Sequence, residues 1–336
     1  MTGEPTALPA PPSAASARGA SVSLVLGSGG ARGYAHIGVI EELEAQGYAI
    51  RSLAGSSMGA LVGGIYATGK LGLFRDWVLP LQRLDVLRLL DWTVFGGGFI
   101  KGDRIIHVLR DLIGDAQIEE LPVPYTAVAV DLDVQREVWF SRGPLFDAIR
   151  ASIAIPTIFR PHRYQGRLLV DGGLLNPLPV SPTLRDLTDA TIAVDVNAAA
   201  EPRYAGHPAR DADRGAAGQA TPEMLPDGGK PAPSDLGQAS YRRRISEFVE
   251  SMIGKREPRM AATREPGMVE LFASSLDIVQ ETITRLKIAA QPPDLLVTIP
   301  RNACAFYEFD RAEELIEIGR LRTREALARW TPPRVR

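Results

Sequence analysis

Ser57 stands in a sequence context that suits a catalytic nucleophile. Residues 55–59 read GSSMG and fit the pattern G-x-S-x-G, in which small flanking residues let the serine adopt a strained turn that exposes its hydroxyl group. The apolar run 50–54 precedes this stretch, and the helix-forming run 60–68 follows it. Because the pattern alone arises by chance in a glycine-rich chain, it is the strand–turn–helix context that predicts a nucleophile elbow at Ser57.

A second strand-to-helix turn carries four glycines. The β-branched run 22–26 precedes it, and the helical pattern of Val39, Ile40 and Leu43 follows. Glycine permits positive φ and close backbone approach, so successive N–H groups can converge on an anion beside the positive end of a helix. This turn is therefore expected to hold an oxyanion or a phosphate group. Its glycines are Gly27, Gly29, Gly30 and Gly33.

Asp171 is a candidate for the base that would activate the serine. It follows the short apolar run 168–170 and precedes Gly172 and Gly173. Catalytic groups in α/β proteins collect at the ends of strands. An aspartate before glycine is also a common way to open a turn, so the pattern at Asp171 fits a catalytic or a structural role.

A histidine is the alternative base, and the chain has four of them. His162, in the loop expected before Asp171, is the one candidate for a Ser–His–Asp triad, although the arginines near it indicate a surface position. The other three are not plausible bases. They are His36, packed in the helix after the glycine turn, His107, in the middle of another helix, and His207, in an insertion.

The composition limits the number of domains and the kinds of partner. A chain of 336 residues that is 45% hydrophobic forms one large α/β domain or two small ones, and the unbroken alternation of strands and helices from 22 to 196 favours one. The net charge of −2, with both signs interspersed, gives no electrostatic case for nucleic-acid binding. The single cysteine, Cys304, excludes an internal disulfide framework and is expected to be buried. No His, Asp and Glu residues show metal-ligand spacing, so we expect neither a metal nor a cofactor.

Three segments have compositions that set them apart. Residues 1–20 are rich in Ala, Pro and Ser and are expected to form a disordered tail. The segment 201–238 is expected to be a mobile insertion that leaves the domain whole. The segment 71–100 combines leucines and aromatics with Pro80 and a glycine triplet. This composition fits either a lid over a binding site or an ordinary helical pair packed on the sheet.

The sequence leaves contact with a membrane surface open. No apolar run approaches the roughly 20 residues of a membrane span, and the N-terminus has no hydrophobic core of the signal-peptide type, so we expect a soluble cytoplasmic protein. The helix expected at 241–253 is amphipathic and begins with three arginines. It fits either a helix on an anionic membrane, peripheral to its inner face, or a surface helix with its apolar face in the core.

Hydrophobic periodicity predicts the remaining elements. Strands are expected at 125–130, 137–140, 168–170, 191–196 and 295–299, and helices at 103–114, 144–152, 269–290 and 311–330. Together these elements predict an α/β fold with a mostly parallel central sheet flanked by helices.

In these motifs the chain resembles the bacterial patatin-like phospholipases, a family that includes the catalytic domain of neuropathy-target-esterase-type lysophospholipases. The similarity rests on the turn 27–33 (GSGGARG), the elbow at Ser57, and the segments 166–181 (GRLLVDGGLLNPLPVS) and 148–159 (AIRASIAIPTIF). It runs from about 21 to about 322. One departure is Ser28, where many members carry another glycine.

The resemblance implies a patatin-like three-layer fold over residues 21–336 and a Ser57–Asp171 dyad in which the carboxylate itself is the base. The activity implied is calcium-independent hydrolysis of fatty-acyl esters of phospholipids or lysophospholipids through an acyl-Ser57 intermediate. The glycines that support these motifs are Gly27, Gly33, Gly55, Gly59, Gly172 and Gly173.

The resemblance also implies where the oxyanion would bind. The donors would be the backbone N–H groups of Gly29, Gly30 and Ala31, with Arg32 near the site. Arg32 has a structural alternative, which is to pair with a carboxylate elsewhere.

Two other functions compete with hydrolysis. The glycine turn could serve a phosphate- or nucleotide-binding protein, but it lacks the lysine of G-x-x-x-x-G-K-[ST]. It also fails to match G-x-G-x-x-G, because Gly27, Gly29 and Arg32 occupy the three positions. A non-catalytic regulatory protein on the same fold is the second alternative.

Overall fold

The structure, a computed structural model, describes residues 19–89, 98–204 and 268–331. Several expectations from the sequence therefore lie outside the described residues. These are nearly all of the N-terminal tail, most of the insertion at 201–238, the basic helix at 241–253 and part of the glycine hinge near 96–98.

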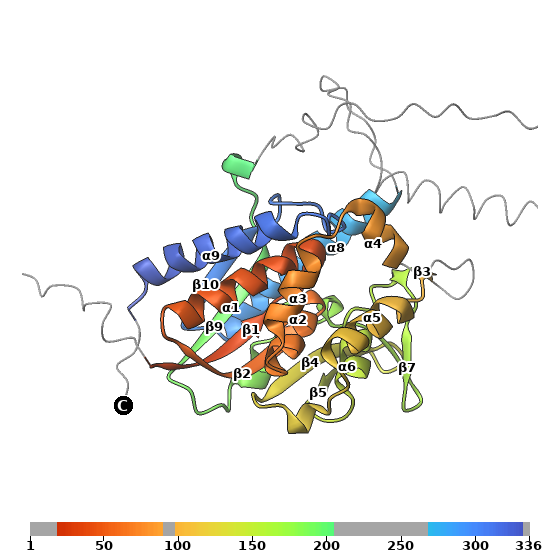
Figure 1. Cartoon of the computed structure of the whole chain (residues 1–336), viewed down its shortest axis with the longest axis horizontal. Coiled ribbons are helices and arrows are strands. Elements are labelled where there is room, and N and C mark those ends of the chain that lie inside the picture. Colours follow the sequence, from red (N-terminus) through yellow and green to blue (C-terminus); the bar gives the residue numbers. More distant parts are fainter. Residues whose placement is uncertain (1–18, 90–97, 205–267, 332–336) are drawn as a thin grey trace, which may run out of the picture.

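An eight-stranded mixed sheet forms the middle layer of the molecule (Figure 1). Its strands are β1 (Ser21–Leu26), β2 (Ala49–Ser56), β4 (Tyr125–Asp131), β5 (Arg136–Phe140), β7 (His162–Tyr164), β8 (Arg167–Asp171), β9 (Ala190–Ala198) and β10 (Leu295–Pro300). The order across the sheet is β10-β9-β1-β2-β4-β8-β7, and β5 also pairs with β4. The first five strands in this order are parallel, whereas β5, β8 and β7 pair antiparallel. A separate short pair joins β3 (Gly98–Ile100) to β6 (Thr157–Phe159).

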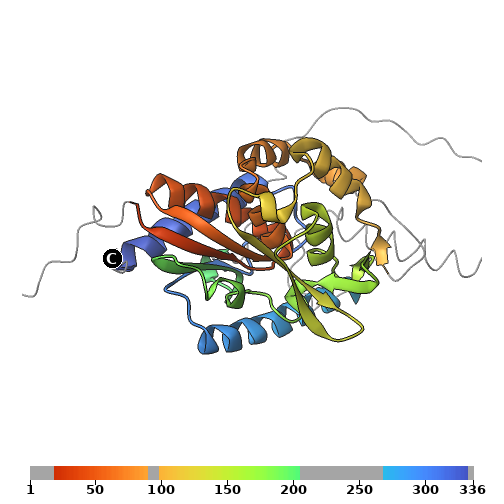
Figure 2. The same ribbon diagram turned by 90° about the horizontal axis from the view of Figure 1, so that it is seen from below.

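Helices cover both faces of this sheet. The described helices are α1 (Ala35–Ala45), α2 (Met58–Ala67), α3 (Leu71–Val78), α4 (Arg83–Leu89), α5 (Asp103–Ile113), α6 (Leu145–Ser152), α8 (Met268–Ala290) and α9 (Ala312–Arg329). Figure 2 shows α8, in light blue, on the opposite face from α1 and α9. Because both faces are covered, the central strands are apolar almost throughout, and five of the six residues of β1 are buried. The expected three-layer α/β fold with a mostly parallel sheet is confirmed.

The register of the central strands brings the two predicted turns together. Strands β1 and β2 are parallel, and Leu26 at the end of β1 pairs with Gly55 near the end of β2. The glycine turn and the nucleophile elbow therefore leave the same edge of the sheet side by side. In β4, Val128 pairs with Ser56 on one side, and the next residue, Ala129, pairs with Asp171 on the other. The antiparallel strand β8 thus delivers Asp171 to the same edge.

The sequence-based elements match the structure closely, with one correction. The segment around His162 was expected to be a loop, but His162–Tyr164 is strand β7, paired antiparallel with β8. The alternation of apolar and polar residues over three residues is too short to separate a strand from a loop.

Cys304 is buried, as expected. Among the described helices, none is long and apolar enough to cross a membrane.

Candidate active site

Ser57 occupies a strained backbone turn between β2 and α2. Its φ of 53° and ψ of −123° lie in a region that residues other than glycine rarely adopt. The flanking glycines make this turn possible. A Cβ atom at Gly55 would lie 2.5 Å from the backbone of Gly59, and one at Gly59 would lie 2.1 Å from the carbonyl oxygen of Leu26.

Ser152, at the end of α6, fixes the backbone of this elbow. Its Oγ accepts a hydrogen bond of 2.9 Å from the N–H group of Ser57 and donates one of 2.6 Å to the carbonyl oxygen of Val128. Ser152 is fully buried, so no water competes for these bonds. The hydroxyl group therefore ties the strained residue to the middle of β4. Sequence reasoning gave Ser152 no role, because one serine inside an apolar helix carries no signal that it will reach another strand.

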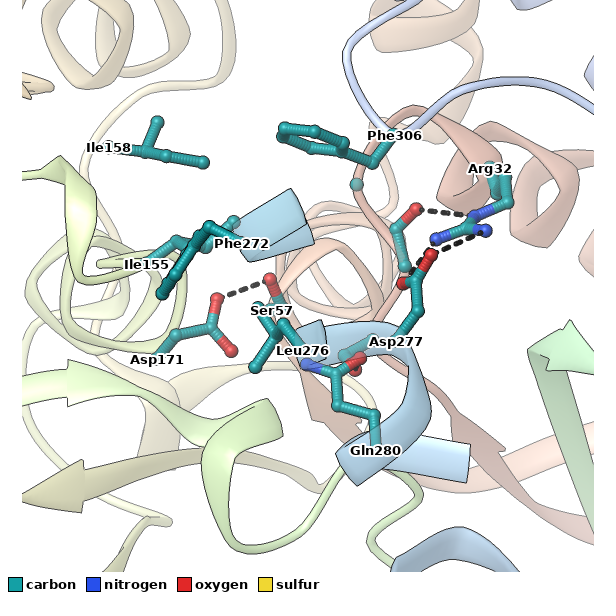
Figure 3. Close-up of a pocket in the computed structure, with 13 residues that line it drawn as sticks. Arg32, Ser57, Ile155, Ile158, Asp171, Phe272, Leu276, Asp277, Gln280 and Phe306 are labelled. Carbon is teal, nitrogen blue, oxygen red and sulfur yellow. Dashed lines mark hydrogen bonds and ion pairs between the residues drawn. The ribbon is translucent and has the colours of Figure 1, made fainter. Parts of the chain in front are cut away.

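Ser57 and Asp171 form a direct hydrogen bond. The Oγ of Ser57 donates to Oδ2 of Asp171 over 2.6 Å (Figure 3), and both side chains are buried. The other carboxylate oxygen, Oδ1, accepts the N–H group of Gly173 over 2.7 Å. The carboxylate is thus held by one bond from each side, with Oδ2 directed at the serine. The two residues proposed from the sequence as nucleophile and base are therefore in direct contact.

Burial changes the acidity of Asp171. Loss of water raises the pKa of this carboxyl group to about 7, while the bonds from Ser57 and Gly173 oppose the rise. A carboxylate with its usual pKa near 4 is a weak base at neutral pH, whereas one near 7 is matched to the pH at which it would work. Burial therefore gives Asp171 a pKa close to the pH at which a general base would work.

The glycine turn presents two free donors to the cavity beside Ser57. The N–H groups of Gly29 and Gly30 make no hydrogen bond to another described residue, and both residues line the cavity. The structure differs from the expectation at Ala31, whose N–H group donates to the carbonyl oxygen of Phe306 over 2.8 Å. Gly30 has a φ of 57°, and a Cβ atom there would lie 2.4 Å from the carbonyl oxygen of Phe306, the same atom that accepts the N–H group of Ala31.

Arg32 pairs with a carboxylate, which was the structural alternative to a place in the oxyanion site. Its guanidinium group forms an ion pair of 2.9 Å with Asp277 of α8 and donates to the carbonyl oxygens of Gly29 and Arg301. The side chain of Arg32 is almost fully buried. These contacts secure the glycine turn to α8, while the backbone of the turn remains beside Ser57.

The described histidines form no hydrogen bond with the Ser57–Asp171 pair. His36 is fully buried in α1, where its Nε2 bonds the carbonyl oxygen of Gly27 and burial lowers its pKa to about 4. His162 bonds Asp147 through its Nε2 over 3.1 Å. His107 is exposed on α5, and His207 lies outside the described residues. The structure therefore brings no described histidine to Ser57.

A small apolar cavity lies over the pair, and α8 forms much of its wall. Its volume is about 30 Å³, which is room for a water molecule or two. The apolar walls are Ile155, Ile158, Phe272, Leu276 and Phe306. None of the described residues of 71–100 lines it, so the described part of that segment gives no support to a lid, which was one of its two alternatives. The periodicity of 269–290 predicted a helix, but nothing in it indicated which face would cover a site more than 200 residues earlier in the chain.

Comparison with known proteins identifies the family to which the chain belongs. The family model described as patatin-like phospholipase matches residues 24–184. An NTE family protein of Mycobacterium tuberculosis (strain ATCC 25618 / H37Rv), itself uncharacterised, is 42% identical over 94% of this chain and 94% of its own length. A counterpart in Mycobacterium bovis shows the same values. The chain belongs to the NTE family of patatin-like phospholipases.

More distant relatives of this NTE family chain share only part of it. Lysophospholipase NTE1 of Yarrowia lipolytica is 32% identical over 53% of the chain and 13% of its own length. Among solved structures, VipD from Legionella pneumophila covers 93% of the chain at 13% identity, with a TM-score of 0.42, a likeness too distant to carry an argument. The family and the fold expected from the sequence are confirmed, and the family supports lipid hydrolysis.

Proposed function

We propose that the protein is a serine acyl hydrolase that cleaves fatty-acyl esters of phospholipids or lysophospholipids with Ser57 and Asp171. The observation that carries this proposal is the 2.6 Å hydrogen bond between the hydroxyl group of a serine in a strained turn and a buried carboxylate. A strained serine that donates to a group with a pKa near 7 is an activated nucleophile. The described residues place no histidine beside it.

The reaction would proceed in two proton-balanced steps. Asp171 accepts the proton of Ser57 as Oγ attacks the ester carbonyl, and the N–H groups of Gly29 and Gly30 stabilise the negative charge on the carbonyl oxygen. Asp171 then returns the proton to the alcohol as the ester bond breaks, which leaves an acyl group on Ser57. In the second step water gives its proton to Asp171 and attacks the acyl group, and the proton passes back to Ser57 as the fatty acid leaves.

The side chains that line the cavity are apolar enough for an acyl chain, but the cavity is too small to hold one. Five aliphatic or aromatic side chains surround the serine, and such a lining favours hydrocarbon over a charged group. The cavity volume of about 30 Å³ is far below that of a fatty acid. Binding would therefore require Phe272 and Leu276 to move away from Ser57.

The phosphate- or nucleotide-binding alternative fits the site less well. No lysine is among the described residues that line the cavity, and Arg32 is already paired with Asp277. A phosphate group at the glycine turn would also face the carboxylate of Asp171, which would repel it. The non-catalytic alternative would leave the strain at Ser57 without a purpose.

Turnover on a panel of esters tests the proposed function. We expect the protein to hydrolyse p-nitrophenyl esters and lysophosphatidylcholine without added metal, because the dyad supplies both nucleophile and base. Release of fatty acid and nitrophenol is measured, and nucleotides are added to the folded protein in a parallel thermal-shift assay. Absence of hydrolysis across the panel, together with a rise in melting temperature on addition of a nucleotide, would favour the binding protein instead.

We also propose that α8 contacts the surface of a lipid aggregate. Its exposed apolar residues are Leu271, Ile278, Val279 and Leu286. Three of its charged residues form ion pairs with the body of the protein, namely Asp277 with Arg32, Glu281 with Arg301 and Lys287 with Glu137. The opposite face of the same helix covers the cavity over Ser57. A helix with four exposed large apolar side chains beside a lipid-cleaving site suits an interfacial position.

Sedimentation with vesicles tests this contact. We expect the protein to sediment with anionic phospholipid vesicles at low salt, and Ile278→Ser to weaken that binding, because it removes apolar area from the exposed face of α8. Leu187→Ser is the matched control, since Leu187 is fully exposed in the loop before β9. Equal sedimentation of the two variants, or negligible sedimentation of the unaltered protein with every vesicle, would count against the proposal.

A further inference from the structure

Gln280 is a buried amide whose orientation its neighbours determine. Only 6% of this residue of α8 is exposed. The Nδ2 of Asn197 donates to the carbonyl oxygen of Ser28 over 2.9 Å, and because a carbonyl oxygen only accepts, this fixes the Asn197 amide. The same Nδ2 lies 3.1 Å from Gln280, so the atom that faces it must be the oxygen, Oε1. The hydroxyl group of Ser28 also donates to Oε1, over 3.0 Å.

The amide nitrogen of Gln280 consequently points the other way, toward the catalytic pair. A Cβ atom at Gly173 would lie 2.6 Å from Nε2 of Gln280 and 2.9 Å from Oδ1 of Asp171. The same position is 2.8 Å from Oγ of Ser28. Because Gly173 has no side chain, these three atoms can come together there. Figure 3 shows Gln280 reaching up from α8, with its nitrogen on the side of Asp171. Nε2 makes no hydrogen bond to another described residue.

Gln280 is one of the residues that line the cavity, so a donor there that lacks a protein partner is available to a bound substrate. The two sides of the site differ. Asn197 and Oε1 lie on the side of the glycine turn, where a Cβ atom at Gly29 would meet Oδ1 of Asn197 at 3.1 Å. Nε2 lies on the side of Asp171. In the proposed reaction Asp171 gives its proton to the departing alcohol, so the alcohol part of the ester lies on this side.

We propose that Nε2 of Gln280 donates a hydrogen bond to an oxygen on the alcohol part of the substrate, next to the ester oxygen. Esters of glycerol carry such an oxygen, whereas esters of simple alcohols do not. Gln280 is then a specificity-determining residue for esters of polyols, and it deepens the proposed function, on which it rests. Ser28, the departure from the glycine pattern, acquires a role here, because its hydroxyl group helps to hold the amide in this orientation.

Two esters that differ only in that oxygen test the proposal. The substrates are the 2-hydroxypropyl and the propyl ester of octanoic acid, and the measurement is the ratio of their kcat/KM values. For the unaltered protein we expect the 2-hydroxypropyl ester to be favoured about 10- to 100-fold, as for a hydrogen bond from a donor that otherwise has no protein partner. In Gln280→Met, which keeps the size and removes the donor, we expect the ratio to fall to near one.

Two further variants separate recognition from support of the fold. Gln280→Glu keeps an acceptor for Ser28 and Asn197 but has no amide donor, so the ratio should fall in this variant too. Asp277→Asn weakens the ion pair that joins α8 to Arg32 without touching Nε2, so both rates should fall together and the ratio should persist. The ratio cancels general losses of activity or folded protein, which affect both substrates alike.

The outcomes also distinguish this inference from the function on which it rests. If the unaltered protein hydrolyses both esters equally, or if Gln280→Met lowers both rates by one factor, acyl hydrolysis stands and the role of Gln280 is overturned. If the unaltered, folded protein hydrolyses neither ester, the proposed function fails and this inference fails with it.

Discussion

Ser57→Ala is expected to lower ester hydrolysis by a factor of roughly 10⁴ or more, since the change removes the atom that would form the acyl-enzyme. The melting temperature should change little. The side chain loses only one oxygen, and alanine meets the same backbone strain as serine at a φ of 53°. Turnover of a p-nitrophenyl ester and thermal unfolding of the two proteins measure these effects.

Ser56→Ala is the matched control for this substitution. The hydroxyl group of Ser56 is buried next to the elbow and has no hydrogen-bond partner among the described residues, so its removal should leave hydrolysis nearly unchanged. Hydrolysis that persists in folded Ser57→Ala would show that another residue is the nucleophile. Loss in Ser56→Ala alone would point to the neighbouring serine.

Asp171→Asn is expected to lower turnover by a factor of about 10² to 10⁴ without unfolding the protein. The amide keeps the shape of the carboxyl group and can still accept the N–H group of Gly173, but it cannot take a proton from Ser57. The measurement is kcat on the same ester, normalised to the amount of folded protein.

Two histidine variants accompany this test. His162→Ala breaks a contact with Asp147 and should retain activity, since a dyad has no imidazole to lose. His36→Ala removes a fully buried side chain, so its activity also has to be normalised to folded protein. Near-complete loss in folded His162→Ala, or full turnover in Asp171→Asn, would restore a histidine-based mechanism.

The raised pKa of Asp171 gives this prediction a pH dependence. Only the ionised carboxylate accepts a proton, so kcat/KM should rise with pH through about 7 and level off above it. The effect on stability has the opposite sign. The folded-state pKa of about 7 exceeds the ordinary 3.8, so the folded protein binds more protons than the unfolded chain between these values, and stability falls as pH rises across that window. Asp171→Asn should therefore gain melting temperature relative to the unaltered protein as the pH is raised from 5 to 8.

The sequence was sufficient for the parts of the site that depend on local patterns. A strand, a tight turn and a helix are encoded within about ten residues, and this is why the elbow at Ser57 and the glycine turn could be predicted. That the glycine turn would serve the same site as Ser57 was implied by the family resemblance, and the parallel pairing of β1 with β2 places the two turns side by side. The Asp171 prediction depended on the family resemblance, because a D-G turn has many uses.

The rest of the site depends on contacts between distant segments. Gln280 reaches Ser28 across 252 positions of the chain, and Ser152 reaches Ser57 across 95. Periodicity indicates which residues form a helix, but not which turn of another element each one will meet. The hydrogen bond from the Ala31 N–H group to Phe306 could not be predicted either, since it depends on how the chain after β10 packs against the glycine turn.

The most direct test of the Ser57–Asp171 site is to label the folded protein with a fluorophosphonate probe and to locate the adduct by peptide mass spectrometry. We expect a single phosphonylated residue, Ser57, formed quickly in the unaltered protein, much more slowly in Asp171→Asn, and not at all in Ser57→Ala. A different modified serine, or no adduct on folded protein that hydrolyses esters, would contradict the assignment of Ser57 as the nucleophile.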